Sequence, residues 1–258
     1  MIIAVQQGPY SALTEAGFKA AGAGADLLIC AEMITTGYNI GAAVHERAEP
    51  ADGPTAERVA KIANGTGVAI AYGYPERVGE KVFNSVQLID AQGTRIANYR
   101  KTHLFGELDK NWFTPGDEAV VQTEFGGLTV GFLICYDVEF PELVRAHALA
   151  GTELLIVPTA LMSPYELVAD TVVRSRAYES QLYVAYANRC DVEAELDYCG
   201  RSSVVSPTGD VLAKAGGGEE LLIATVDRAT LRHSRTENTH LADRRPELYP
   251  LLNKGTTS

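Results

Sequence analysis

The chain has 258 residues, of which 46% are hydrophobic and 21% charged, and this ordinary globular composition leads us to expect one large α/β domain over residues 1–258. Its formal net charge of −11 repels phosphate backbones and anionic lipids, so we expect no nucleic-acid partner and no membrane partner. The opening residues lack a basic stretch followed by an apolar core, and no apolar run approaches the ~20 residues that span a bilayer, so we expect a cytoplasmic location.

Apolar runs of strand length alternate with helical stretches, which indicates an α/β fold. The candidate strands, in chain order, are residues 2–6, 26–31, 68–74, 82–89, 94–99, 128–135, 153–159, 183–188, 202–207 and 221–226. The pairs Gln92–Gly93 and Thr208–Gly209 are typical of hairpin turns, so the sheets should be mixed rather than wholly parallel.

Helices are expected near residues 11–23, 54–65, 139–150 and 165–181. In the third, the apolar side chains recur at helical spacing on one stripe, and His147 lies on that stripe, where packing or a local hydrogen bond is its expected role. No linker rich in Pro, Gly or Ser divides the chain. We therefore expect two packed sheets within one domain.

The chain contains only four cysteines, which are Cys30, Cys135, Cys190 and Cys199. So few cysteines in a chain of this length favour a reducing compartment, where a free thiol can act as a nucleophile. Cys190 and Cys199 flank an acidic loop, but neither belongs to a CxxC pair and no histidines cluster nearby. Zinc is therefore not expected there, and we expect no metal and no cofactor.

Cys135 ends the apolar run LTVGFLIC and precedes the helix that is expected to begin near Glu139. Such a turn lifts a side chain clear of the sheet, and the positive end of the helix favours thiolate over thiol. The N–H of Tyr136 is placed to stabilise an oxyanion. Taken alone, however, a cysteine at a strand end is usually a buried side chain that packs in the core and has no catalytic role.

Two charged residues end other apolar runs. Glu32 follows DLLICA, and Lys101 follows the strand after the Gln92–Gly93 turn. The C-terminal edge of strands is where ligands bind in α/β sheets. Each residue alone would be a surface charge, but a carboxylate, an amine and a thiol together are the groups that a thiol-dependent hydrolase of carbon–nitrogen bonds needs.

The order Glu, Lys, Cys on separate strands resembles the nitrilase superfamily of carbon–nitrogen hydrolases, in particular its short bacterial amidases. The most specific matching segments are LLICYDVEFPELVR and KTHLFGELDKNWFTPGD, and the resemblance runs from IIAVQ to SSVVSPTGD. It implies a four-layer αββα sandwich of two mixed β-sheets. It also implies that Cys135 is the nucleophile, Glu32 the general base and Lys101 the group that helps hold the tetrahedral oxyanion, with a thioester intermediate.

The chain departs from the family pattern at two places. Many members carry a second glutamate before a downstream Pro-Gly; counting back from Pro115–Gly116, that position falls on Asp109, and Glu107 is the nearest glutamate. Which of these carboxylates serves stays open. Ala31 stands where the family commonly has proline.

Other matches to the family concern structure and assembly. Glu142 resembles a residue that pairs with an arginine, here Arg176 in preference to Arg174, and Asn188 resembles a residue that braces the fold. The late segment LADRRPELY is similar to tails that often join subunit interfaces, so a homodimer or larger homo-oligomer is expected.

The Glu–Lys–Cys set does not choose the substrate, because amides, carbamoyl compounds and nitriles share it. CYDVEFPE, PTALMSP and DRRPEL most resemble amidases that act on small aliphatic or amino-acid-like amides, with N-carbamoyl amidohydrolase second and nitrilase third. The side chains expected to line the pocket are Tyr38, Phe105, Tyr136 and Met162. A thiol redox or binding protein, or a silent scaffold, is the competing class, and the base and ammonium count against both.

Overall fold

The first of two sheets has the strand order β14–β1–β2–β3–β4–β5 in the computed structural model, which describes residues 1–253. Its strands are β1 (Ile2–Gln7), β2 (Leu27–Ile29), β3 (Ala69–Val78), β4 (Lys81–Ile89), β5 (Arg95–Arg100) and β14 (Glu220–Thr225). Strands β1, β2 and β3 are parallel, whereas β4 is antiparallel to both β3 and β5. Strands β2, β3 and β5 therefore point the same way, and their C-terminal ends meet at one edge.

The second sheet has the order β13–β12–β9–β8–β7–β6. Its strands are β6 (Gln122–Phe125), β7 (Leu128–Phe132), β8 (Leu154–Pro158), β9 (Tyr183–Ala187), β12 (Ser203–Val205) and β13 (Val211–Lys214). The central strands β7, β8 and β9 are parallel and the outer ones antiparallel. A short separate hairpin joins β10 (Val192–Glu193) to β11 (Leu196–Asp197).

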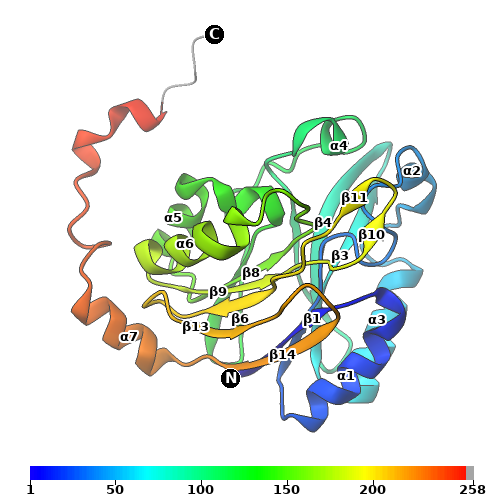
Figure 1. Cartoon of the computed structure of the whole chain (residues 1–258), viewed down its shortest axis with the longest axis horizontal. Helices are drawn as coiled ribbons and strands as arrows, with labels where there is room; N and C mark the ends of the chain where they lie inside the picture. Colours follow the sequence, from blue (N-terminus) through cyan, green and yellow to red (C-terminus); the bar gives the residue numbers. More distant parts are fainter. Residues whose placement is uncertain (254–258) are drawn as a thin grey trace.

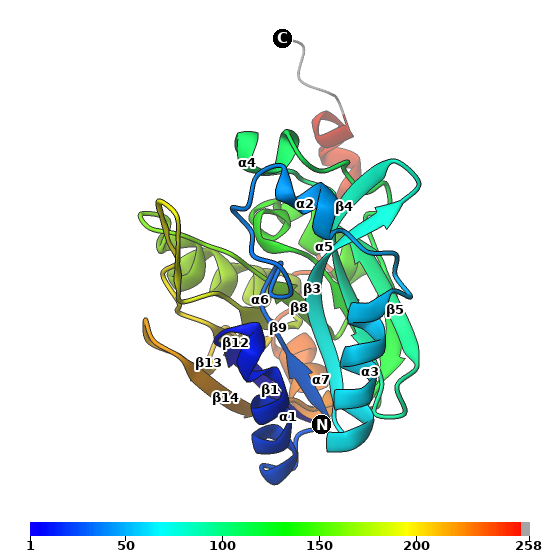
Figure 2. The ribbon, with the colours of Figure 1, turned by 90° about the vertical axis from the view of Figure 1, so that its right-hand side faces the viewer.

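Helices cover the outer face of each sheet. In Figure 1, α1 (Leu13–Gly22) and α3 (Pro54–Thr66) lie on one side of the molecule, and α5 (Pro141–Leu149) and α6 (Val173–Ser180) lie on the other. Figure 2 brings the layer of α1 and α3 toward the viewer. The layers follow one another as helices, sheet, sheet, helices, so the expected four-layer αββα sandwich with two mixed sheets is confirmed.

The alternation of side chains along the strands explains the two packed faces of the first sheet. Ile3 and Val5 of β1 pack into the core shared with the second sheet, whereas Ala4, between them, packs toward α1 and α3. Successive side chains of a strand point to opposite faces, and both faces are covered here. The strands accordingly consist of nearly continuous apolar residues.

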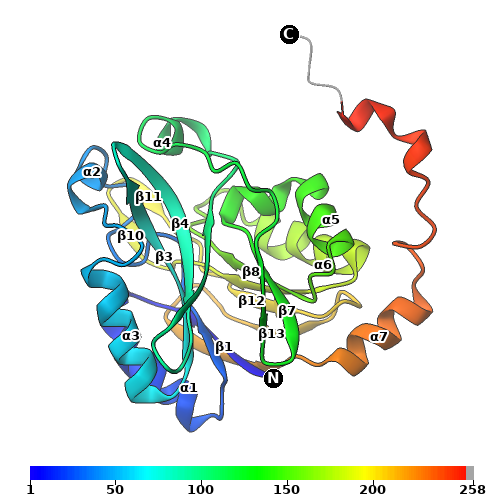
Figure 3. The ribbon, with the colours of Figure 1, turned by 180° about the vertical axis from the view of Figure 1, so that it is seen from behind.

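The remaining elements are short or lie at the periphery. They are α2 (Ala43–Arg47), α4 (Gly106–Lys110), α7 (Arg228–Glu237), a π-helical turn at Val168–Val172, and 3₁₀ turns at Tyr10–Ala12, Cys135–Glu139, Pro246–Leu248 and Pro250–Asn253. After α7 the chain runs along the outside of the α5–α6 layer, as Figures 1 and 3 show. Among residues 1–253, no helix combines the length and the apolar composition that crossing a membrane requires.

The expected strands and helices are all present, with shifted ends, and both hairpin turns join antiparallel strands. The main local difference concerns the run that was expected to end in Cys135. Strand β7 stops at Phe132, and a 3₁₀ turn from Cys135 to Glu139 precedes α5, which begins at Pro141. Proline suits that first helical turn because its missing N–H would have no partner there.

Candidate active site

Glu32 and Lys101 emerge at the same edge of the first sheet. Glu32 follows β2, and Lys101 follows β5 directly, with its N–H donating to the carbonyl of Asn84 at 2.8 Å. The Glu32 N–H donates at 3.4 Å to the carbonyl of Thr159, which lies just beyond β8 in the second sheet. Because β7 is parallel to β8, the turn that carries Cys135 reaches this same edge.

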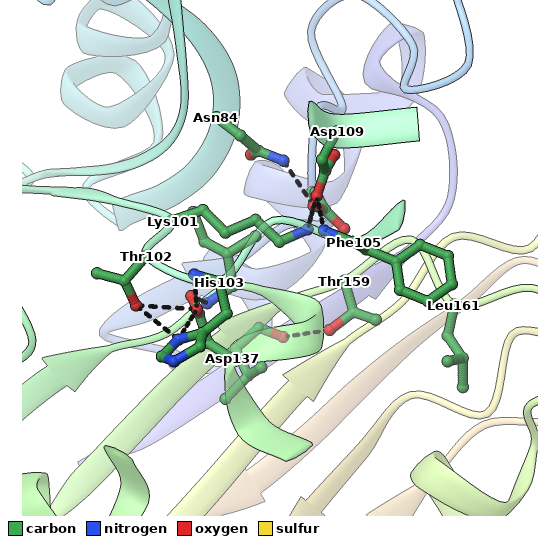
Figure 4. Close-up of polar contacts among 12 residues, drawn as sticks. Asn84, Lys101, Thr102, His103, Phe105, Asp109, Asp137, Thr159 and Leu161 are labelled. Carbon is green, nitrogen blue, oxygen red and sulfur yellow. Dashed lines mark hydrogen bonds and ion pairs between the residues drawn. The ribbon is translucent and has the colours of Figure 1, made fainter. Parts of the chain in front are cut away.

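A buried ionic cluster surrounds the amine of Lys101. Its Nζ lies 2.8 Å from Glu32 Oε1 and 2.7 Å from Asp109 Oδ2, and Asn84 Nδ2 donates to Glu32 Oε1 at 2.7 Å (Figure 4). The side chains of Lys101, Glu32 and Asp109 have 0% of their surface exposed. An ammonium without solvent requires such partners, because an isolated buried charge is strongly disfavoured.

The structure distinguishes the two candidate second carboxylates. Asp109 lies on α4 and points inward to Lys101, and its Oδ2 also accepts the N–H of Phe105 at 2.9 Å. Glu107, two residues earlier on the same short helix, is exposed to solvent. Of the two, only Asp109 belongs to the cluster.

The turn that carries Cys135 has an unusual backbone. Cys135 has φ of +47°, in the left-handed region that a residue with a side chain adopts rarely and at a cost of about 1–3 kcal/mol. Asp137, whose side chain is fully buried, accepts the N–H of Ile134 at 3.0 Å and so holds the backbone directly before the strained residue.

Asp137 also ties this turn to the end of β5. Its carboxylate accepts the Tyr99 hydroxyl at 2.9 Å, the Thr102 hydroxyl at 3.1 Å and the His103 N–H at 2.9 Å, and Figure 4 shows the last two of these residues converging on it. These residues flank Lys101 on both sides. Asp137 therefore fixes the Cys135 turn relative to the lysine.

The surroundings of Cys135 disfavour its thiolate form. Burial raises its pKa well above the usual value, the carboxylate of Glu32 raises the pKa further, and the ammonium of Lys101 lowers it. The ammonium thus favours the thiolate, as expected, but burial and the neighbouring carboxylate outweigh it. A group that removes the thiol proton is required for nucleophilic attack.

The shifted pKa values suit Glu32 to accept a proton and Lys101 to remain a fixed positive charge. Burial raises the pKa of Glu32, with Lys101 opposing the shift, so the carboxyl is a stronger base than an exposed glutamate. Burial lowers the pKa of Lys101, but Asp109 and Glu32 raise it, and the net shift is well upward. Lys101 consequently stays an ammonium.

Three acceptors in this cluster have no hydrogen-bond donor among the described residues. They are Glu32 Oε2, Asp109 Oδ1 and the side-chain oxygen of Asn84. Buried polar atoms usually have partners, so each of these oxygens has the capacity to accept a further hydrogen bond. A thiol proton, a water molecule or an amide N–H of a substrate fits that chemistry.

The residues expected to line the pocket lie around the cluster. The ring of Tyr38 has its centroid 5.7 Å from Lys101 Nζ, and Phe105 meets Tyr136 edge to face at 5.3 Å. Tyr38 and Met162 are buried in one apolar cluster. These side chains surround the charged cluster with apolar surface.

One expected structural pair is wrong. Arg176 forms its ion pair with Glu179 at 3.0 Å and donates to the carbonyls of Val138 and Glu139, whereas Glu142 is exposed. The arginine still holds the turn that carries Cys135, but through backbone oxygens. The bracing role of Asn188 is confirmed, since its side chain bonds both backbone groups of Leu161.

Sequence reasoning missed two buried members of the site, Asn84 and Asp137. Asn84 interrupts an apolar strand, and Asp137 follows the cysteine by two residues, so a polar residue at a buried position was the available signal. In the part of the chain that the structure describes, no group of three or more His, Cys, Asp and Glu residues could hold a metal ion.

Comparison with known sequences gives the following. Residues 4–236 match the family described as carbon-nitrogen hydrolase. A "Hydrolase in pqqF 5'region" of Pseudomonas protegens is 55% identical over 232 residues, which cover 89% of this chain and 81% of the relative. An N-carbamoylputrescine amidase of Solanum lycopersicum is 34% identical over 254 residues, which cover 89% of this chain and 84% of the relative.

Among solved structures, the NitN amidase of Nesterenkonia sp. AN1 superposes with a TM-score of 0.87 at 31% identity, covering 98% of this chain and 99% of that one. One variant of that amidase has been solved in complex with butyramide. Another, with glutamate replaced by glutamine, carries the acetamide moiety of fluoroacetamide bonded to the active-site cysteine.

Proposed function

The chain belongs to the carbon–nitrogen hydrolase family, and from that premise we propose that it is an amidase which converts a small aliphatic or amino-acid-like amide to a carboxylic acid and ammonia. The observation that carries the proposal is the solvent-free cluster of Glu32, Lys101 and Asp109 beside a protonated Cys135 thiol. That cluster combines a base, a fixed positive charge and a nucleophile.

In the first half of the reaction, Glu32 accepts the Cys135 proton and the sulfur attacks the amide carbon. The raised pKa of Glu32 makes this transfer from a protonated thiol more favourable than it would be for an exposed carboxylate. The proton then passes to the leaving nitrogen, the carbon–nitrogen bond breaks and ammonia departs. A thioester remains on Cys135.

Negative charge develops on the substrate oxygen during each attack. The ammonium of Lys101, kept charged by Asp109, stabilises that oxyanion without reorganisation because it is already held in place. We assign the backbone N–H of Tyr136 as a second donor. In the second half, water attacks the thioester with Glu32 again as base, and the acid is released.

The substrate class follows from the surround. The apolar cluster that includes Tyr38, Met162 and Tyr198 supports a small acyl group, aliphatic in the first place and amino-acid-like in the second. The NitN amidase, whose structures contain butyramide and an acetamide adduct, supports the same class.

An N-carbamoyl amidohydrolase is the second candidate, favoured by the N-carbamoylputrescine amidase relative at 34% identity. Nitrile hydrolysis ranks third. A thiol sensor is disfavoured, because a sensor needs a thiolate, whereas burial raises the pKa of Cys135.

The test is ammonia release from short aliphatic amides, amino-acid amides, N-carbamoyl compounds and nitriles, with intact-mass detection of the acyl-enzyme. An amidase releases ammonia and a carboxylic acid, whereas a carbamoylase releases ammonia, carbon dioxide and an amine. Cys135→Ala is the control and should lose both turnover and the mass adduct. Turnover that survives in this variant would remove the thioester from the reaction.

We further propose that the enzyme is a cytoplasmic homodimer or larger homo-oligomer. Four apolar side chains beyond α7 are exposed: Leu248 (57%), Tyr249 (40%), Leu251 (71%) and Leu252 (64%). A run of exposed apolar residues of this kind favours burial against another chain. Light scattering on the purified protein tests the point, and a monomeric mass at micromolar concentration would contradict it.

A further inference from the structure

The hairpin of β10 and β11 contacts two segments that end at the active-site edge. It leaves the second sheet after β9 and returns to it at β12. On one side it reaches residues 161–163: Ser163 N–H donates to the Asp197 carbonyl at 2.9 Å, and Cys199 N–H donates to the Leu161 carbonyl at 3.1 Å. This segment directly follows Thr159, whose carbonyl accepts the Glu32 N–H.

On its other side the hairpin holds the segment after Glu32 through one carboxylate. Glu193 Oε2 accepts the backbone N–H of Tyr38 at 3.0 Å and that of Asn39 at 2.6 Å. The same oxygen accepts the Tyr198 hydroxyl at 2.7 Å and Arg189 Nη1 at 3.2 Å. Four donors on one oxygen, with the Glu193 side chain only 17% exposed, make a charge-assisted anchor.

Gly37 permits this close approach. It has φ of +95°, and a Cβ at this position would collide with the carboxylate of Glu193. Only glycine adopts that backbone readily while leaving room for the carboxylate. A glycine is therefore required at the point where the hairpin meets the segment after Glu32.

The segment that Glu193 holds bears on the charged centre. Tyr38 is 5% exposed, and its ring lies against Lys101, with 5.7 Å from the ring centroid to Nζ. Glu193 forms no hydrogen bond or ion pair with Lys101, Glu32 or Cys135, so its effect on them is indirect and passes through the residues that it holds, Tyr38 foremost.

We propose that Glu193 is a positioning residue, which clamps residues 33–39 so that Tyr38 packs on Lys101 and the base and ammonium keep their places relative to Cys135. The proposal rests on the amidase function given above. A shift of about 1 Å in a reacting group costs on the order of 100-fold in rate, so loss of the clamp should lower kcat by about 10- to 100-fold. KM should change less than kcat, since Glu193 itself touches no substrate and acts only through Tyr38 and Tyr198.

The experiment compares Glu193→Gln with Glu195→Gln. Glu195 lies in the same hairpin and makes one exposed 3.2 Å hydrogen bond to the Asn39 side chain, so it is matched in residue type and location. For each full-length variant, kcat and KM, the rate of Cys135 alkylation by iodoacetamide, and hydrogen exchange of the peptide 33–39 are measured. Glu193→Gln should lower kcat, change the alkylation rate and raise exchange in that peptide, and Glu195→Gln should match the wild type.

Glu193→Asp keeps the charge on a shorter arm and should restore part of kcat, a recovery that loss of general stability would not give. If Glu193→Gln fails to fold, Glu193→Asp is the variant that tests the inference. Wild-type exchange, alkylation and kcat in both Glu193 variants would overturn the inference. Absence of ammonia release from the wild type would instead refute the amidase function, and the exchange and alkylation results would still decide whether Glu193 clamps the segment.

Discussion

Lys101 Nζ lies 2.7 Å from Asp109 Oδ2 at a place where neither side chain touches solvent. With Glu32 as the other partner, two carboxylates share one ammonium, so the cluster holds one more negative than positive charge when both are ionised. The surplus is tolerated because Glu32, with its raised pKa, can hold a proton. In the proposed mechanism, Asp109 therefore secures the lysine while Glu32 exchanges protons with the thiol.

Replacing Asp109 by asparagine should lower kcat by about 100-fold or more, because the oxyanion-stabilising ammonium loses one of its two buried partners. Glu107→Gln, on the same helix but exposed, is the control and should stay within about twofold of the wild type. Steady-state ammonia release measures both. Wild-type kcat in both variants would show that neither carboxylate takes part in the reaction.

Glu32→Gln preserves shape and the hydrogen bond from Asn84 but removes the base. Because burial raises the pKa of the thiol, little thiolate exists without Glu32, and acylation should slow by at least about 100-fold. The measurement is the rate at which intact mass shows acyl-enzyme after mixing. A burst as fast as that of the wild type would contradict the assigned role.

Gly73→Ala should reduce activity with a smaller effect on the fold. Gly73, on β3, lies so close to the base that an added Cβ would be 2.8 Å from Glu32 Cα and 2.5 Å from Met33 N, so the backbone that carries Glu32 must move. We expect kcat to fall by about 10- to 100-fold. Gly65→Ala, in α3 with nothing within 4 Å of its added Cβ, should keep full activity. Wild-type kcat in Gly73→Ala would show that the base tolerates displacement.

His147 should make the protein less stable in acid. Burial lowers its pKa from 6.5 to about 4, so between these values the unfolded chain binds a proton that the folded protein does not. Stability is therefore lost as pH falls from 6.5 toward 4, by about 3 kcal/mol for the full shift. Urea unfolding at pH 7 and pH 4 measures this in the wild type and in His147→Gln, which does not titrate. Parallel losses in both proteins would remove His147 as the cause.

The sequence predicts the central strands well because both of their faces are buried and their residues are almost uniformly apolar. It misses β6 and β13, which lie at the sheet edges and carry exposed polar residues such as Glu124 and Lys214. It also misses α7, where Leu231 and Ser234 are the only buried positions, although the Asp227 cap that accepts the Thr230 N–H was a usable signal.

The residues of the candidate site likewise fall into two groups, those that the local sequence predicts and those that it does not. Glu32, Lys101 and Cys135 each follow an apolar strand, so local sequence marks them. The choice of Asp109 over Glu107 depends on which face of α4 turns inward, and five residues of helix carry too little pattern to show that. The protonated state of Cys135 depends on burial by segments distant in sequence, which a helix-start argument does not include.

The carboxylate of Asp137 joins the residues around Lys101 to the turn before Cys135 without help from the chain between them. Apart from Asp109 and its neighbours on α4, changes in the exposed part of that intervening stretch should therefore leave the reacting groups in place. The exposed residues Asp117–Ala119 should accept insertions while the chemistry stays intact. Natural variation and protein engineering can therefore both change the length of this loop without moving the residues of the site.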